Sequence, residues 1–77
     1  MIHELKCWPE YFVAMARGHK CFEFRKDDRG FSVGDHLKLM EWCPKTKTYS
    51  GQSRIRQICY ILRDREGLTE NYVVLGL

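Results

Sequence analysis

Three charged side chains stand at short, fixed offsets in the first half of the chain. Lys20, Glu23 and Arg25 follow a glycine within Gly18-His19-Lys20-Cys21-Phe22-Glu23-Phe24-Arg25. One carboxylate between two cations is held ionised, because nearby opposite charges favour its charged form. Such a cluster can bind a phosphate or a base edge, or polarise a carbonyl. The same residues can equally form an exposed, salt-bridged strand face that contributes little to stability.

The elements around this cluster follow from a change of sequence period at Gly18. Residues 9–17 are expected to form a helix, because a proline suits its first position and apolar residues recur at i, i+3 and i+4. Gly18 then acts as a left-handed cap, and residues 20–26 alternate as a strand does. This alternation puts the carboxylate and the guanidinium of the cluster on one face, with the lysine at the helix–strand junction.

Strand patterns account for most of the remaining chain. Further strands are expected over residues 2–8, 36–42, 54–62 and 72–77, with a polar connection over 43–51. Alternation slips along 54–62, which predicts a β-bulge or a strand that passes from a rim into the interior. The order β-α-β-β-β-β predicts one domain over residues 1–77 of the α+β class, mainly β. Its one short N-terminal helix and five to six strands are expected to form a small closed barrel.

Composition limits the kinds of protein that this chain can be. It has 77 residues, 44% of them apolar, and no run approaching the length of a membrane span. A secretion signal is absent from the N-terminus, which favours a cytoplasmic protein with reduced thiols. The four cysteines form no C-x-x-C pair, so neither a metal site nor a cofactor is expected. Cys21 and Cys59 lie in strand-like stretches and are interpreted as small core residues.

Charge is unevenly distributed although the formal net charge is only +3. From residue 42 to 62 the chain carries Lys45, Lys47, Arg54 and Arg56 and no acid. Such a stretch can contact the phosphates of a nucleic-acid backbone, or it can be a solvated hairpin.

Several aromatic, histidine and turn residues can also be interpreted either as binding groups or as structural ones. Trp8, Trp42 and Tyr49 can stack on bases or serve as core and rim packing. His3, His19 and His36 have no partner at a diagnostic spacing and are expected at the surface or at strand ends. Asp28 and Arg29 are interpreted as a turn pair.

The residues of the charged cluster also match a known signature. Gly18, Lys20, Glu23 and Arg25 fit the G-x-K-x-x-E-x-R pattern of ASCH domains, within the PUA-like superfamily. The chain as a whole resembles most closely the small DUF3850 group of ASCH-related proteins, common in bacteria and phages. The further matching segments are His3-Glu4-Leu5-Lys6, Pro9, Phe12, Asp28-Arg29, Phe31, Gly34-Asp35, Tyr49-Ser50-Gly51, Tyr60-Ile61-Leu62 and Tyr72-Val73-Val74-Leu75-Gly76.

The resemblance implies a PUA-like β-barrel closed on one side by the helix. Beside that helix it implies a cleft for RNA or a nucleotide-like ligand, lined by Lys20, Glu23 and Arg25, with Lys6 a neighbour from the preceding strand. Some ASCH proteins are hydrolases of modified nucleosides or of RNA. In one amidohydrolase branch a threonine occupies the position of Glu23, which argues against transferring that mechanism, although a carboxylate can serve as a general base.

Three functions are therefore open from the sequence. The first is a binding module for RNA or a nucleotide. The second is a hydrolase in which Lys20 polarises a carbonyl and Glu23 activates water. The third is a protein-interaction domain whose basic hairpin binds an acidic partner. No nucleophile–base–orienter triad is visible, which weighs against the hydrolase.

Overall fold

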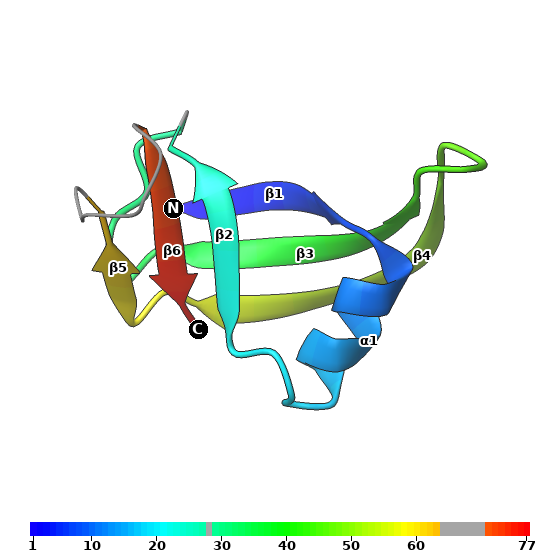
Figure 1. Ribbon diagram of the computed structural model, residues 1–77, viewed down its shortest axis with the longest axis horizontal. Coiled ribbons are helices and arrows are strands. Elements are labelled where there is room, and N and C mark those ends of the chain that lie inside the picture. The colour runs from blue at the N-terminus through cyan, green and yellow to red at the C-terminus, as the bar shows by residue number, and fades with distance from the viewer. Residues whose placement is uncertain (28, 64–70) are drawn as a thin grey trace.

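The computed structural model describes residues 1–27, 29–63 and 71–77. The turns expected at Asp28 and over residues 64–67 lie outside them. The described residues form, in order, β1 (Ile2–Cys7), α1 (Pro9–Ala16), β2 (Phe22–Lys26), β3 (His36–Cys43), β4 (Thr48–Gln57), β5 (Tyr60–Leu62) and β6 (Tyr72–Gly76) (Figure 1). The expected class, mainly β with one short N-terminal helix, is confirmed.

The strands pair into two three-stranded sheets. The first has the order β1-β3-β4, with β1 parallel to β3 and β3 antiparallel to β4. The second has the order β2-β6-β5 and is antiparallel throughout. In Figure 1 the strands of the second sheet run across those of the first. The helix α1 lies beside the first sheet, at the end where β1 leads into the helix.

The closed barrel is not seen among the described residues, because no ladder joins the two sheets. β1 and β2 are both edge strands of their own sheets. Two guanidinium groups reach β1 instead: Arg25 of β2 donates a hydrogen bond to the carbonyl of Lys6, and Arg29, beyond the end of β2, donates one to the carbonyl of Glu4 at 2.9 Å. Side chains therefore bridge the place where a barrel would have backbone pairing.

The helix that the sequence pattern predicts is confirmed. It begins at Pro9, and its buried stripe consists of Phe12 and Met15. Arg17 caps its C-terminus, and Gly18 follows with φ +79°, a conformation that glycine adopts without a steric cost. The reversal at Gly18 directs the chain from the helix back toward the second sheet.

The core lies between the two sheets and the helix. Its buried members are Leu5, Cys7, Phe12, Met15, Phe31, Leu37, Leu39, Ile58, Val73 and Leu75. Leu37 and Leu39 of β3 are fully buried in it, and Val73 and Leu75 are the buried positions of β6.

Two expected strand limits differ from the structure. The polar connection expected over 43–51 is shorter, because β4 already begins at Thr48 and pairs with the end of β3. Residues 48–57 are mostly exposed, so no apolar alternation marks this strand in the sequence. The strand expected over 54–62 divides at Ile58 and Cys59, where the chain passes from the first sheet to the second. That passage explains the slip in alternation.

The placement of two cysteines in the core was wrong. Cys21 and Cys59 are both exposed, and Cys7 is the buried thiol. Cys21 precedes β2, where its thiol donates to the carbonyl of Gly18 at 3.3 Å. Cys59 lies in the passage between the sheets, where Ile58 takes the core position.

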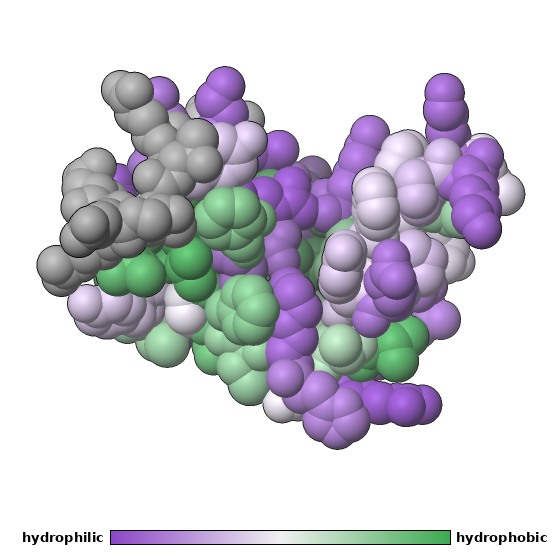
Figure 2. Space-filling view, viewed as in Figure 1, coloured by the Kyte–Doolittle hydropathy of each residue, from purple (hydrophilic) through white to green (hydrophobic). Residues whose placement is uncertain are grey.

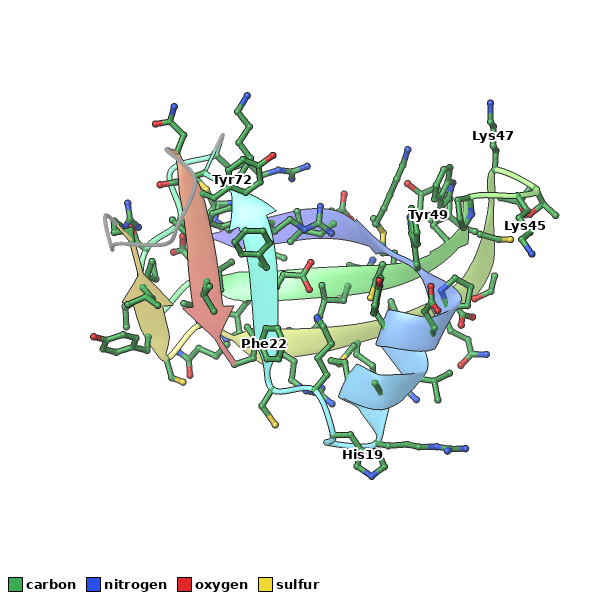
Figure 3. All side chains as sticks on the ribbon, in the orientation of Figure 1. His19, Phe22, Lys45, Lys47, Tyr49 and Tyr72 are labelled. Atoms are coloured by element: carbon green, nitrogen blue, oxygen red, sulfur yellow. The ribbon has the colours of Figure 1, made fainter. Side chains whose placement is uncertain are left out.

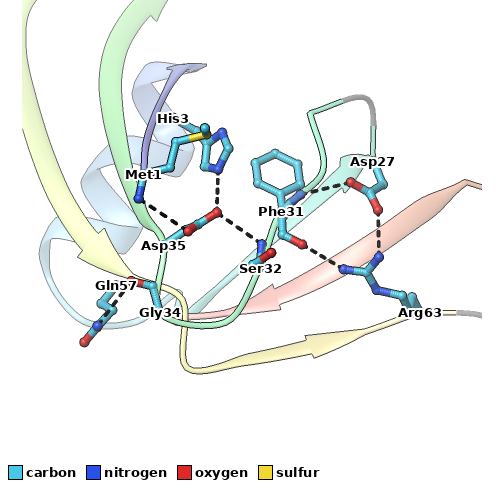
Figure 4. Close-up of polar contacts among 9 residues, drawn as sticks. All are labelled: Met1, His3, Asp27, Phe31, Ser32, Gly34, Asp35, Gln57 and Arg63. Carbon is cyan, nitrogen blue, oxygen red and sulfur yellow. Dashed lines mark hydrogen bonds and ion pairs between the residues drawn. The ribbon is translucent and has the colours of Figure 1, made fainter.

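His3 lies near the start of β1, one of the two kinds of place expected for it, but it is buried rather than exposed. The alternation of β1 turns it inward, where its Nε2 lies 2.8 Å from an oxygen of Asp35 and its ring meets the edge of Phe31 (Figure 4). The backbone N–H of Ser32 donates to the same carboxylate at 3.2 Å, and the N-terminal ammonium lies 3.5 Å from it. This carboxylate joins β1 to the turn before β3.

Acid should weaken the fold through Asp35. The hydrogen bond with His3, aided by those from Ser32 and the N-terminus, lowers the pKa of Asp35 below its ordinary 3.8. A carboxyl group whose pKa falls on folding stabilises the protein fully above its unfolded pKa, and that stability is lost as the pH falls through the folded pKa. Asp35→Asn should therefore flatten the dependence of unfolding free energy on pH below about 4. Urea unfolding at a series of pH values measures it.

The control for this prediction is Glu4→Gln, which removes an exposed carboxylate on the same strand as His3. It should leave the acid slope close to that of the wild type. An unaltered slope in Asp35→Asn would mean that the Asp35 carboxylate is not a source of the acid dependence.

Candidate functional site

The three charged residues of the signature converge in the structure. Glu23 is buried, with its side chain only 8% exposed. Its Oε1 accepts a hydrogen bond from Lys20 Nζ at 3.0 Å, and its Oε2 accepts one from Arg25 Nε at 2.6 Å. Lys20 also donates to the carbonyl of Phe22 at 2.8 Å. The cluster is therefore a buried carboxylate bound by two cations, and not the exposed, salt-bridged strand face that the sequence left open.

The pairing of β2 explains why these side chains face inward. Glu23 lies opposite Leu75 of β6, and Arg25 lies opposite Val73, both core residues. Directly opposed residues share a face of a sheet. Glu23 and Arg25 therefore point between the sheets, while Phe22 and Phe24 point outward, as the alternation of the sequence predicts.

The free edge of β2 borders a cavity of about 600 Å³. This cavity, here called the β2 cleft, is lined by Lys6, Cys7, Trp8, Tyr11, Lys20, Phe22, Glu23, Phe24, Arg25 and Lys26. In Figure 2 hydrophilic side chains form a band down the middle of this face, between the apolar side chains of the second sheet and the helix. The cleft thus combines apolar walls with charged groups, as ligand sites usually do.

Backbone groups also face the β2 cleft. The N–H of Leu77 donates to the carbonyl of Cys21, and the N–H of Asp27 donates to the carbonyl of Asn71. In an antiparallel ladder, residues two apart bond to the same neighbour, so residues 21, 23, 25 and 27 bond toward β6. The N–H and C=O of Phe24 consequently point to the free edge and add a neutral donor and acceptor there.

The cations of the cleft keep donors to spare. An ammonium has three N–H groups and a guanidinium has five. Within the described residues, the contacts of Lys20 and Arg25 leave one N–H of the lysine and three of the arginine without a protein acceptor. Together with Glu23 they carry one net positive charge, to which Lys26 at the rim adds another. Spare donors and a net positive charge are chemically able to hold an anionic or strongly accepting group.

Lys6 is placed at the cleft, but its side chain does not join the cluster. Its carbonyl accepts the hydrogen bond from Arg25, whereas its ammonium lies 4.4 Å from the centroid of the Trp42 ring. Cation–π contacts of this kind hold a cation near an aromatic face. The expected role of Lys6 as a neighbour of the site therefore belongs to its backbone.

The thiols of the described residues are free and differ in reactivity. Burial, with the nearby carboxylate of Glu23 as the next cause, raises the pKa of Cys7. Its thiol stays protonated at neutral pH and is a poor nucleophile. Hydrogen bonds from the backbone N–H and the hydroxyl of Thr46 instead lower the pKa of Cys43, outside the cleft.

Three aromatic side chains form a wall of the cleft: Trp8, a stacking candidate from the sequence, and Tyr11 and Phe22, which the sequence did not single out for stacking. The rings of Trp8 and Tyr11 stack with centroids 6.2 Å apart, and Lys20 Nζ lies 5.8 Å from the Tyr11 ring and 4.9 Å from the Phe22 ring. The i, i+3 spacing of Trp8 and Tyr11 at the start of the helix was the signal available for this pair.

The chain matches a known protein family over almost its entire length. The profile of DUF3850, a domain of unknown function, matches residues 2–77, almost the entire chain. The chain belongs to the DUF3850 family. It is also similar to an uncharacterized 12.9 kDa protein in the GpA 3′ region of Escherichia phage P2, with 37% identity over 75 residues. That match covers 96% of this chain and 65% of the phage protein, so the chain spans about two thirds of its relative's length.

The basic stretch of this DUF3850 domain does not form one patch. Lys45 and Lys47 lie at the tip of the β3–β4 hairpin, with Tyr49 just behind them (Figure 3). Arg54 and Arg56 lie along β4 opposite the core residues Leu39 and Leu37, and the Arg54 guanidinium lies 5.7 Å from the Phe12 ring. Both arginines donate to carbonyls of β4, so part of their donor capacity is used locally.

Metal-binding clusters and membrane-spanning helices are both absent from the described part of this DUF3850 domain. No three or more His, Cys, Asp or Glu side chains of the described residues gather where they could hold a metal ion. Among the same residues, the helix is too short to span a membrane.

Proposed function

We propose that this DUF3850 domain binds RNA or a nucleotide-like ligand in the β2 cleft. The observation that carries the proposal is the incomplete neutralisation of two cations by one buried carboxylate. Glu23 orders Lys20 and Arg25 but leaves N–H donors and a net positive charge in the cavity. Preorganised, charge-assisted donors of this kind suit a phosphate or the acceptor edge of a base.

The walls of the cleft support the same ligand class. Trp8, Tyr11 and Phe22 offer aromatic faces beside the cations, and a nucleotide presents a planar base next to a charged group. The likeness of Gly18, Lys20, Glu23 and Arg25 to the ASCH signature is consistent with this. The assignment of the domain to the PUA-like superfamily, with its closed barrel, is part of the proposal.

Hydrolysis of a modified nucleoside or of RNA is the competing function. It needs Glu23 to accept a proton from water, yet each oxygen of this carboxylate already accepts a hydrogen bond from a cation. The buried thiol of Cys7 is protonated and supplies no nucleophile. Both observations favour binding over catalysis. A protein-interaction role for the hairpin has less support, because its cations are dispersed.

Lys20→Gln should weaken the binding of a short single-stranded RNA about tenfold to a hundredfold. The change removes a charged donor, whose loss typically costs about 1.5–3 kcal/mol. The slope of log affinity against log salt should also become less steep by about 0.7, because one phosphate contact is lost. Fluorescence anisotropy with a labelled RNA octamer at several salt concentrations measures both quantities.

The matched control is Lys47→Gln, which removes the same charge at the hairpin tip, away from the cleft in Figure 3. It should change affinity and salt slope much less than Lys20→Gln. A larger effect at Lys47 than at Lys20 would move the binding site to the hairpin and contradict the proposal.

A further inference from the structure

The second sheet has an outer face that the core does not use. The inward side chains of this sheet include Glu23, Ile61, Val73 and Leu75, which face the first sheet. The opposite parity projects outward. These outer positions, here called the outer face, are Phe22, Phe24, Lys26, Tyr60, Leu62, Tyr72, Val74 and Gly76.

The outer face is unusually rich in exposed aromatic rings. Phe22, Phe24 and Tyr60 are 48%, 51% and 60% exposed. The rings of Phe24 and Tyr72 stack at 5.3 Å with an interplanar angle of 20°. Apolar side chains gather over this sheet in Figure 2, and Figure 3 shows Phe22 and Tyr72 on neighbouring strands. Exposed clusters of this kind mark binding surfaces more often than chance.

The register gives the outer face a slot. Phe22 pairs with Gly76, and Gly76 pairs with Tyr60, so one row reads aromatic, glycine, aromatic. Strands lie about 4.8 Å apart, so about 10 Å separates the backbones beneath the two rings. Gly76 places no side chain of its own between them, and the Cβ of Tyr60 and the thiol of Cys59 border it on one side. A planar base fits such a gap, with the glycine as its floor.

The charge and position of this face favour RNA as its occupant. None of its eight positions, all among the described residues, is an acid, and Lys26 is one of them. Phe22, Phe24 and Lys26 line the β2 cleft as well, so the rings and the cations of the cleft form one continuous surface. Single-stranded RNA presents bases for the rings and phosphates for the cations.

A second copy of the chain fits less well. Three strands, of which β6 has five residues, form a face of about 14 by 16 Å, which is a flat area of about 230 Å². A stable interface buries about 800 Å² on each partner. By contrast, aromatic sheet faces in RNA-binding domains hold two or three bases.

We infer that single-stranded RNA crosses the outer face, with a base between Phe22 and Tyr60 over Gly76, and enters the β2 cleft with its phosphates. This inference rests on the proposed function of the cleft and extends it from a nucleotide to a strand.

The test compares adenosine monophosphate with a single-stranded RNA octamer and an RNA duplex of the same sequence. The wild type should bind the octamer more tightly than either of the others, because only unpaired bases can stack. Tyr60→Leu should weaken octamer binding about five- to a hundredfold, the range for loss of one stacked base. Binding of the monophosphate should not change, because Tyr60 is not among the residues that line the cleft. Titration calorimetry gives each affinity.

Tyr49→Leu is the matched control, because it removes a tyrosine ring of similar exposure on the hairpin. It should leave octamer binding unchanged. Octamer binding that survives Tyr60→Leu would overturn the inference and leave the proposed function intact. If the wild type bound neither the monophosphate nor the octamer, both the inference and the proposed function would be overturned. If sedimentation equilibrium showed a wild-type dimer that Tyr60→Leu converts to a monomer, the outer face would be a dimer interface, and the inference would be overturned.

Discussion

Replacing Lys20 and Arg25 together with methionine should lower the free energy of unfolding by about 3–5 kcal/mol, because Glu23 then stays buried without a cation. The geometry makes this outcome specific. The carboxylate is almost fully enclosed, and its two hydrogen bonds come from these two side chains, one to each oxygen. Methionine keeps the apolar stems of both residues and removes only the charged ends. Denaturant unfolding of the purified variants measures the loss.

The triple variant that adds Glu23→Gln to this pair separates charge from packing. A neutral amide is far less costly to bury than an unpaired carboxylate, so the triple variant should recover most of the lost stability. Lys38→Met offers a contrast, since its ion pair with Glu4 is long, at 3.7 Å, and exposed, and its loss should cost no more than about 1 kcal/mol. A triple variant no more stable than the double one would show that lost contacts, rather than the unpaired charge, cause the destabilisation.

The sequence was informative wherever local chemistry determines the structure. Pro9 and Gly18 bound the helix because their backbone preferences act within a single turn. The alternation of β2 placed Glu23 and Arg25 on one face, and the signature identified the three residues that meet in the cleft. These features depend on neighbours only a few residues apart.

Features that depend on long-range pairing could not be predicted from the sequence. The parallel pairing of β1 with β3 sets His3 beside Asp35, 32 residues away, and no spacing rule connects them. The passage of the chain between sheets at Ile58 was visible only as a slip in alternation. The burial of Glu23 likewise follows from packing of the second sheet on the core. A pattern of charges on a strand carries no information about which face the rest of the chain covers.

Two aromatic residues of the cleft wall were missed for a related reason. Tyr11 and Phe22 come from the helix and from β2, and they meet at Lys20 only after the turn at Gly18 brings these elements together. The basic residues around the β3–β4 hairpin show the same limit of sequence reasoning. They are near one another in the sequence, but the length of the hairpin separates Lys45 and Lys47 at its tip from Arg54 and Arg56 along β4.

Glu23→Gln should leave RNA bound and should reveal no catalytic loss, because the wild type is expected to have no turnover to lose. In the binding function, the carboxylate positions Lys20 and Arg25, and a glutamine keeps its shape while removing its charge. The affinity for a single-stranded RNA octamer should then fall by no more than a few hundredfold, as for loss of a charged hydrogen bond. Release of the two cations to the ligand offsets part of that loss.

The hydrolase function makes a different and larger prediction for the same variant. If Glu23 were the general base, its replacement would cut turnover about 10²–10⁴-fold while leaving substrate binding nearly unchanged. The experiment incubates wild type, Glu23→Gln and the exposed control Glu4→Gln with acylated nucleosides and with RNA, and titrates each protein with the RNA octamer. Product formed by wild type and by Glu4→Gln but not by Glu23→Gln, at equal affinity, would establish the enzyme. Binding by all three without product supports the cleft as a binding site, because its carboxylate then acts on the ligand only through the two cations that it orders.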